Sequence, residues 1–109
     1  MSYKLRFSKL AVRDMENVLI YTLNHFGERK HREYRELLKQ ALKEMAANPR
    51  RWPARQRPEI HRDAWTFHIE RRGKKARHFF LYRIYDDFVE IGRLLHDSMD
   101  IEEHSSGFE

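Results

Sequence analysis

The apolar run FVEIGRLLH, residues 88–96, ends in two side chains that could do chemistry. Arg93 carries a permanent charge suited to phosphates and carboxylates. His96 can take up or release a proton near neutral pH. Asp97 and Asp100 follow closely and add negative charge. Three interpretations stay open for this chain segment: an acid–base site, a docking surface for another protein, or the ordinary end of a strand.

Cleavage of RNA would require several groups in this region. The reaction needs a base for the 2′-hydroxyl, cations for the phosphate and an acid for the leaving oxygen. His96 would have to act alone or with Arg77 or Arg93, or with His68 from an earlier run, next to carboxylates that repel the substrate. His96 is therefore the catalytic candidate if the protein is an endonuclease, but docking is the favoured interpretation.

Other catalytic and metal-binding patterns are missing. The chain has no cysteine, which excludes disulfides and thiolate zinc sites. Glycine-rich phosphate loops and nucleophile elbows do not occur. The seven histidines form no helical HxxxH pair and no local ligand spacing; they lie at positions 25, 31, 61, 68, 78, 96 and 104. We expect neither a metal nor a cofactor.

Charge is unevenly distributed along the 109 residues. All 22 basic residues lie at or before Arg93, whereas four of the 17 acidic residues fall in the last ten positions, so the first 99 residues carry a net charge of +9. We expect one domain over residues 1–100 and a frayed acidic tail over 101–109. A basic surface suits nucleic acid, the ribosome or an acidic protein, or serves only for solubility.

No signal peptide or membrane span is apparent in the sequence. We therefore expect a cytoplasmic protein without a membrane partner. A basic nucleic-acid-binding module would explain the charge but not the RLLH motif. Direct nucleic-acid binding is not expected, because aromatic and basic residues do not interleave. Trp52 and Trp65 are expected to pack over the helices instead.

Hydrophobic spacing predicts the elements of the fold. Residues 3–7 alternate as in a half-buried strand. Ser8 can cap a helix that ends at Gly27, and a second helix follows until Asn48-Pro49. The first helix places five apolar residues on one face: Val12, Met15, Leu19, Leu23 and Phe26. Since the connection at Gly27 is short, the two helices should form an antiparallel α-hairpin.

Three β-rich runs follow a basic loop, at residues 64–70, 77–85 and 88–96. The connections between them, RRGKKA and Asp86-Asp87, are short enough for hairpins, so the runs should form an antiparallel meander. The N-terminal strand is expected to join this sheet at an edge. The predicted fold class is α+β, with an α-hairpin packed on a small antiparallel sheet.

This order of elements, together with specific residues, resembles toxins of the RelE/ParE superfamily and in particular its ParE branch. The resemblance covers residues 3–100 and rests on YKLRFSKLAVRDMENVLIY, on ALKEMAANP and above all on FFLYRIYDDFVEIGRLLHDSMD. The last stretch follows the family order of Tyr-Arg, acidic turn, Val-Glu-Ile, and a closing Arg, two apolar residues, His and Asp. In this chain, the pattern begins at Tyr82 and ends at Asp100.

The resemblance implies a toxin of a type II toxin–antitoxin module, as found in plasmid stabilisation systems. ParE-like members inhibit DNA gyrase, whereas RelE-like members are ribosome-dependent messenger RNA endonucleases. Nuclease-type members carry an Arg on the middle strand, three residues before its Tyr, and this chain has Phe79 there. The resemblance therefore favours a gyrase inhibitor that acts by binding and is not an enzyme; an RNase using His96 is the alternative.

The resemblance also implies two partners, namely gyrase and a ParD-like antitoxin whose flexible C-terminal part folds on the toxin. Expected target-binding residues are Arg83, Arg93, His96 and Asp100. Arg83 and Arg93 could equally form structural ion pairs with Glu90, Asp86 or Asp100. Expected antitoxin contacts are Val18, Leu19, Leu38 and Leu42.

Overall fold

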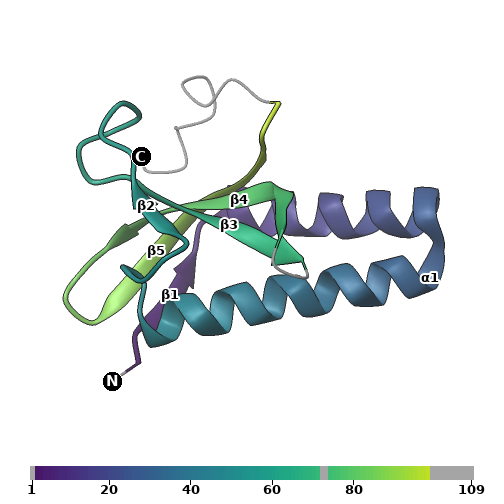
Figure 1. The fold of residues 1–109 in the computed structure, drawn as a ribbon, viewed down its shortest axis with the longest axis horizontal. Coiled ribbons are helices and arrows are strands. Elements are labelled where there is room, and N and C mark those ends of the chain that lie inside the picture. Colours follow the sequence, from purple (N-terminus) through teal and green to yellow (C-terminus); the bar gives the residue numbers. More distant parts are fainter. Residues whose placement is uncertain (1, 72–73, 99–109) are drawn as a thin grey trace.

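The computed structural model describes residues 2–71 and 74–98 of the chain. They form a helical element and a five-stranded sheet in a mixed α+β arrangement (Figure 1), which confirms the expected fold class. In chain order the elements are β1 (Lys4–Phe7), α1 (Lys9–Ala47), β2 (Ala54–Gln56), β3 (Trp65–Arg71), β4 (Lys74–Ile84) and β5 (Phe88–His96).

The helical element α1 begins at a capped N-terminus and is interrupted in its middle. The Ser8 side chain accepts a hydrogen bond from the backbone N–H of Ala11 at 3.0 Å. Gly27 has φ 87° and ψ 177°, a backbone conformation that is accessible almost only to glycine. Figure 1 shows the chain reversing there, so that the two halves of α1 lie side by side. We call residues 9–26 the outgoing arm and residues 28–47 the return arm.

The sheet has the strand order β1-β5-β4-β3-β2. Strands β3, β4 and β5 form the antiparallel meander that the sequence predicted. β1 lies at the expected edge, where it pairs with β5 in parallel orientation, with Lys4 opposite Phe88. The parallel pairing is possible because almost the whole chain connects these two strands.

Two strand features were not predicted. The three-residue β2 pairs with β3 and forms the other edge of the sheet. Arg71 and Lys74 are paired across β3 and β4, so both strands extend into the connection that was expected at residues 71–76. Residues 72–73 of that connection lie outside the described residues.

The core occupies both faces of the sheet. The larger cluster fills the space between α1 and the sheet and comprises Ala11, Leu38, Ala41, Met45, Phe67, Ile69, Phe80, Tyr82, Val89, Ile91 and Leu94. A smaller cluster on the other face comprises Ala64, Phe79, Leu81 and Leu95, with Ile60 against it. Within the described parts of the chain, the length and hydropathy of the helices do not suit a membrane span.

Only part of the predicted apolar stripe of the outgoing arm packs against this core. Met15 and Leu19 pack against the larger cluster. Val12, Leu23 and Phe26 are 41, 39 and 63% exposed. α1 projects beyond the sheet (Figure 1), so the part of the stripe nearest Gly27 has no sheet to cover.

Candidate functional site

The structure does not bring the expected target-binding residues together. Arg83 lies opposite Glu90, near the turn that joins β4 to β5. His96 lies opposite His78 at the other end of the same pair of strands. Asp100 falls outside the described residues. Among the described residues, the set is therefore divided between the two ends of one hairpin.

Arg93 is held in a structural ion pair. Its Nε donates to Asp14 Oδ2 at 2.7 Å and its Nη2 donates to Asp14 Oδ1 at 3.0 Å. The Leu94 backbone N–H donates to the same carboxylate at 3.0 Å. The Arg93 and Asp14 side chains are only 13 and 14% exposed. This geometry favours the structural interpretation of Arg93 and places the pair between α1 and β5.

Asp14 was not identified from the sequence, although a signal for it exists. Asp14 lies beside Met15 and one turn after Ala11, which both belong to the core-facing side of the helix. An acid at such a position needs a partner in the folded protein. The sequence suggested nearby acids as partners of Arg93 and could not identify one that lies 79 positions away.

His96 belongs to a chain of polar rings on the α1 side of the sheet. The Oη atom of Tyr34, in the return arm, lies 2.6 Å from Nδ1 of His78 in a hydrogen bond. The His78 and His96 ring centroids are 5.1 Å apart and the rings are nearly perpendicular. The Ser98 backbone N–H donates to His96 Nδ1 at 3.1 Å. His96 Nδ1 also lies 2.7 Å from Ser98 Oγ.

The electrostatics of this chain of rings limit the chemistry that it could do. Burial, aided by the neighbouring His96, lowers the pKa of His78 to about 4, and Asp97 opposes this shift. Burial raises the pKa of the Tyr34 phenol above its usual range. Near neutral pH, His78 is uncharged and Tyr34 is protonated. His78 and Tyr34 are therefore poor candidates for proton exchange with a substrate in this pH range.

The remaining histidine of the central strands, His68, lies on the other face of the sheet. Its Nε2 is 2.9 Å from Asp97 Oδ1, and its ring lies 5.0 Å from that of Phe79. Phe79 belongs to the smaller core cluster, whereas its neighbour His78 faces α1. His68 does not join His96 as the sequence suggested, because alternation along the strands separates them.

Arg83 lies at the turn end of the hairpin. Its Nη2 is 3.4 Å from His61 Nε2 in the loop before β3. At 3.4 Å this is a long contact between a guanidinium and an imidazole. It positions Arg83 near the loop and away from His96.

The four expected antitoxin contacts differ in burial. Val18, Leu19 and Leu42 are half-buried and pack against the edge of the larger core cluster. Leu38 is only 4% exposed and belongs to that cluster. The periodicity of the return arm could not distinguish a core position from a position at its margin. Leu38 thus has almost no surface to offer a partner.

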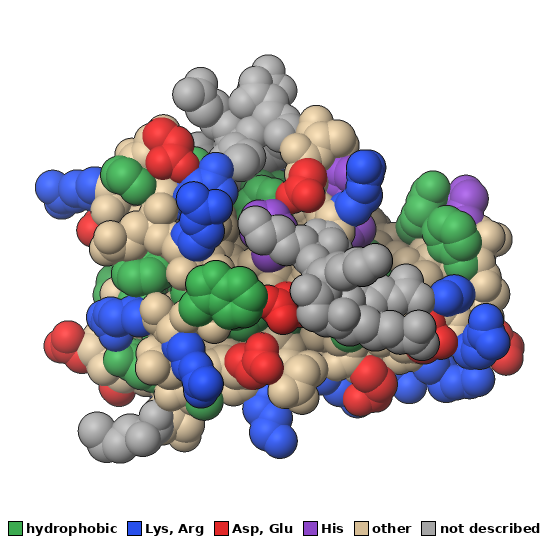
Figure 2. All heavy atoms as spheres, in the orientation of Figure 1, with side chains coloured by type: hydrophobic (Ala, Val, Ile, Leu, Met, Phe, Trp, Pro, Cys, Tyr) green, Lys and Arg blue, Asp and Glu red, His purple; other side chains and the backbone are tan. Residues whose placement is uncertain are grey.

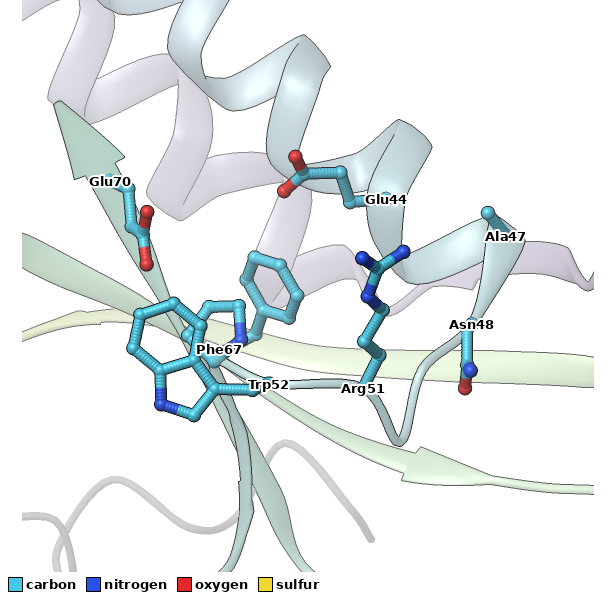
Figure 3. A pocket seen from close by; sticks show the side chains of 8 residues that line it. Glu44, Ala47, Asn48, Arg51, Trp52, Phe67 and Glu70 are labelled. Carbon is cyan, nitrogen blue, oxygen red and sulfur yellow. The ribbon is translucent and has the colours of Figure 1, made fainter. Parts of the chain in front are cut away.

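A pocket of about 310 Å³ lies where α1 ends and the chain enters β2. It is lined by Glu44, Ala47, Asn48, Arg51, Trp52, Pro53, Phe67 and Glu70. Figure 3 shows the Glu44 and Glu70 carboxylates above the rings of Trp52 and Phe67. Trp52 was expected to pack over the helices but is 73% exposed. The lining includes no residue of the His78–His96 cluster, and no group of metal-binding side chains occurs in the described residues.

The comparisons with known proteins agree on the kind of fold. The sequence matches the family model for the ParE toxin of the type II toxin–antitoxin system parDE over residues 5–101. The solved structure of the "Chromosomal ParDE TA system from P. aeruginosa" aligns with a TM-score of 0.69 at 15% identity, covering 87% of this chain and 96% of that chain. This likeness supports the fold. No curated protein matches.

The family model covers the strands, both arms of α1 and the RLLH segment, which are the elements on which the sequence resemblance rested. Its match extends over most of the 109 residues. The chain therefore belongs to the ParE toxin family of type II toxin–antitoxin systems.

Proposed function

We propose that this ParE-family toxin acts by binding DNA gyrase in the cytoplasm and blocking its supercoiling activity, without chemistry of its own. The observation that carries the proposal is the Arg93–Asp14 ion pair. Arg93 is the cation closest in sequence to His96, and its guanidinium is bound to Asp14. A nuclease would need that cation to stabilise the phosphate of its substrate. Arg77 does not replace Arg93 in this role. Arg77 is two residues before Phe79, so both side chains lie on the same face of the sheet, whereas His96 lies on the other face, towards α1.

A second candidate function is a ribosome-dependent endonuclease. The observation in its favour is the pairing of His78 and His96, with ring centroids 5.1 Å apart. Two imidazoles can share the roles of general acid and general base. The low pKa of His78 weakens this candidate, because a neutral, half-buried imidazole donates no proton at pH 7.

The antitoxin is proposed to be a small ParD-like protein with an acidic, amphipathic segment. The net charge of +9 on residues 1–99 attracts such a segment, and half-buried apolar side chains provide it with a place to dock. We retain Val18, Leu19 and Leu42 as contacts and no longer propose Leu38. Co-expression of the toxin with its neighbouring reading frame should give a complex that co-purifies.

A plasmid supercoiling assay with purified gyrase tests the proposed target, together with a primer-extension assay on translating ribosomes. We expect loss of supercoiling and intact messenger RNA. Codon-directed cleavage with unaffected gyrase would favour the endonuclease instead. Failure of the antitoxin to restore supercoiling would count against the toxin–antitoxin pairing.

A further inference from the structure

The turn of α1 extends beyond the body of the protein. The α1 residues that belong to the larger core cluster or pack against it lie at positions 11–19 and 34–45. Residues 20–33 contribute no side chain to either cluster. Figure 1 shows this part of α1 projecting past the sheet. We call residues 20–33 the hairpin tip.

The outgoing-arm part of the hairpin tip, residues 20–26, exposes large hydrophobic side chains. Four of the eight exposed large hydrophobic residues in the described chain lie within it: Ile20, Tyr21, Leu23 and Phe26, at 56, 55, 39 and 63% exposure. Figure 2 shows hydrophobic side chains and a histidine gathered at the end of the molecule where Figure 1 places the turn. A contiguous group of this kind on a small protein marks an interaction surface.

The aromatic side chains of the hairpin tip are held in place before any partner binds. The Tyr21 and His25 rings stack with centroids 3.9 Å apart, and His25 Nδ1 donates to the Tyr21 backbone carbonyl at 2.9 Å. The Phe26 ring meets the Tyr21 ring edge-on at 6.3 Å. Side chains that are already ordered lose little entropy on binding. The hairpin tip therefore presents these rings as one packed, convex group.

The size of this surface argues against a second copy of the chain as its occupant. Four partly exposed apolar side chains present on the order of 400 to 500 Å², given roughly 150 to 250 Å² for each aromatic residue. A stable flat interface needs about 800 Å² on each partner. Two hairpin tips in contact would fall short of this area. A partner that encloses the hairpin tip from several sides would also bury its polar side chains and so cover more area than a second hairpin tip could.

We propose that the hairpin tip inserts as a wedge into a concave, apolar site on the folded protein that the toxin inhibits. This inference rests on the proposed function, and identifies the part of the toxin that contacts its target. A single folding segment of an antitoxin presents a convex surface of its own, whereas a large target offers clefts. The return-arm part of the hairpin tip has both signs of charge, because Arg29 and Lys30 pair with Glu33. The site that takes up the hairpin tip is therefore defined by its apolar, concave shape.

The test uses the full chain with the double substitution Tyr21→Ala and Phe26→Ala, and Trp52→Ala as the matched control. All three side chains are more than half exposed, so the fold should persist, as checked by circular dichroism. We expect the double variant to require at least about tenfold more protein for gyrase inhibition and to lose growth arrest in cells. Trp52→Ala should behave as the wild type. Co-purification with the antitoxin should be unchanged.

Several results would overturn the wedge. In the first, the double variant inhibits gyrase as strongly as the wild type. In the second, the double variant no longer binds the antitoxin but still inhibits gyrase. In the third, the wild type is a dimer in solution and the double variant is a monomer. If the wild type leaves gyrase active but arrests growth, and the double variant does not arrest growth, gyrase is the wrong target. The hairpin tip would then still be the part of the toxin that contacts its target. Should the double variant unfold, Phe26→Lys at the most exposed position of the hairpin tip provides the same comparison.

Discussion

Asp14 links the outgoing arm of α1 to strand β5. It accepts two hydrogen bonds from the Arg93 guanidinium and one from the Leu94 backbone, in a region that is largely closed to water. A charge pair at low exposure contributes stability only while both members are present. The RLLH segment thus has a structural role at Arg93, while His96, two strand positions from Leu94, keeps partial access to solvent.

We predict that Asp14→Ala lowers the free energy of unfolding by about 2 to 3 kcal/mol, because it leaves the Arg93 cation without its carboxylate. Arg93→Ala should also destabilise the protein, and the double variant should lose less than the sum of the two changes. Urea unfolding of the three variants measures these values. Unchanged stability of Arg93→Ala with lost gyrase inhibition would restore Arg93 as a docking residue.

His78 makes stability depend on pH. Its pKa is about 4 in the folded protein and about 6.5 in an unfolded chain. As the pH falls from about 7 towards 4, the unfolded chain takes up a proton that the folded chain does not, so the free energy of unfolding decreases. We expect a decrease on the order of 1 to 2 kcal/mol, allowing for screening at a half-buried ring.

The matched variant for this prediction is His78→Gln, which keeps a polar side chain but cannot be protonated. Urea unfolding of both proteins at about pH 7 and pH 4.5 isolates the contribution of the imidazole, since all other titrating groups are shared. The wild type should lose more stability than the variant. Parallel losses in the two proteins would show that His78 is not the group responsible.

At the scale of elements, the N-terminal edge strand, the meander and the two helical stretches follow from local patterns, and the rest does not. Alternation predicted β1, β-rich runs with short connections predicted β3, β4 and β5, and Ser8 and Gly27 mark the helix start and the break. β2 has only three residues and lies within a basic loop, so its pairing depends on β3. The hydrophobic spacing of the helix does not indicate at which residue α1 extends past the edge of the sheet.

Gly27 permits the reversal within α1, and a substitution there tests this role. A Cβ at this position would meet nothing within 4 Å, so the cost of Gly27→Ala is conformational. We predict a loss of about 1 to 2 kcal/mol, because an L-residue is strained at φ 87°. Thermal unfolding measures it. A semisynthetic D-alanine at this position should be tolerated, and equal destabilisation by both enantiomers would contradict the conformational explanation.

At the scale of the whole molecule, the basic charge of the protein and the exposed hydrophobic residues of the hairpin tip have different roles in binding. The positive charge of residues 1–99 accelerates encounter with acidic partners, and the hairpin tip supplies contact area once they meet. The sequence revealed the charge and the family motif. It could not reveal which apolar residues lie beyond the sheet or that Arg93 is already paired, because both depend on contacts between distant parts of the chain.

The most direct test of the central claim is a supercoiling titration in which gyrase and relaxed plasmid are held constant and the toxin is varied. If the toxin acts by binding, inhibition should saturate at a roughly stoichiometric ratio of toxin to gyrase. His96→Gln should still reach full inhibition, because no proton transfer by the toxin is involved; loss of a target contact at His96 would only raise the toxin concentration that this requires. Full supercoiling at a large excess of folded toxin, accompanied by cleavage of messenger RNA that His96→Gln abolishes, would contradict the account.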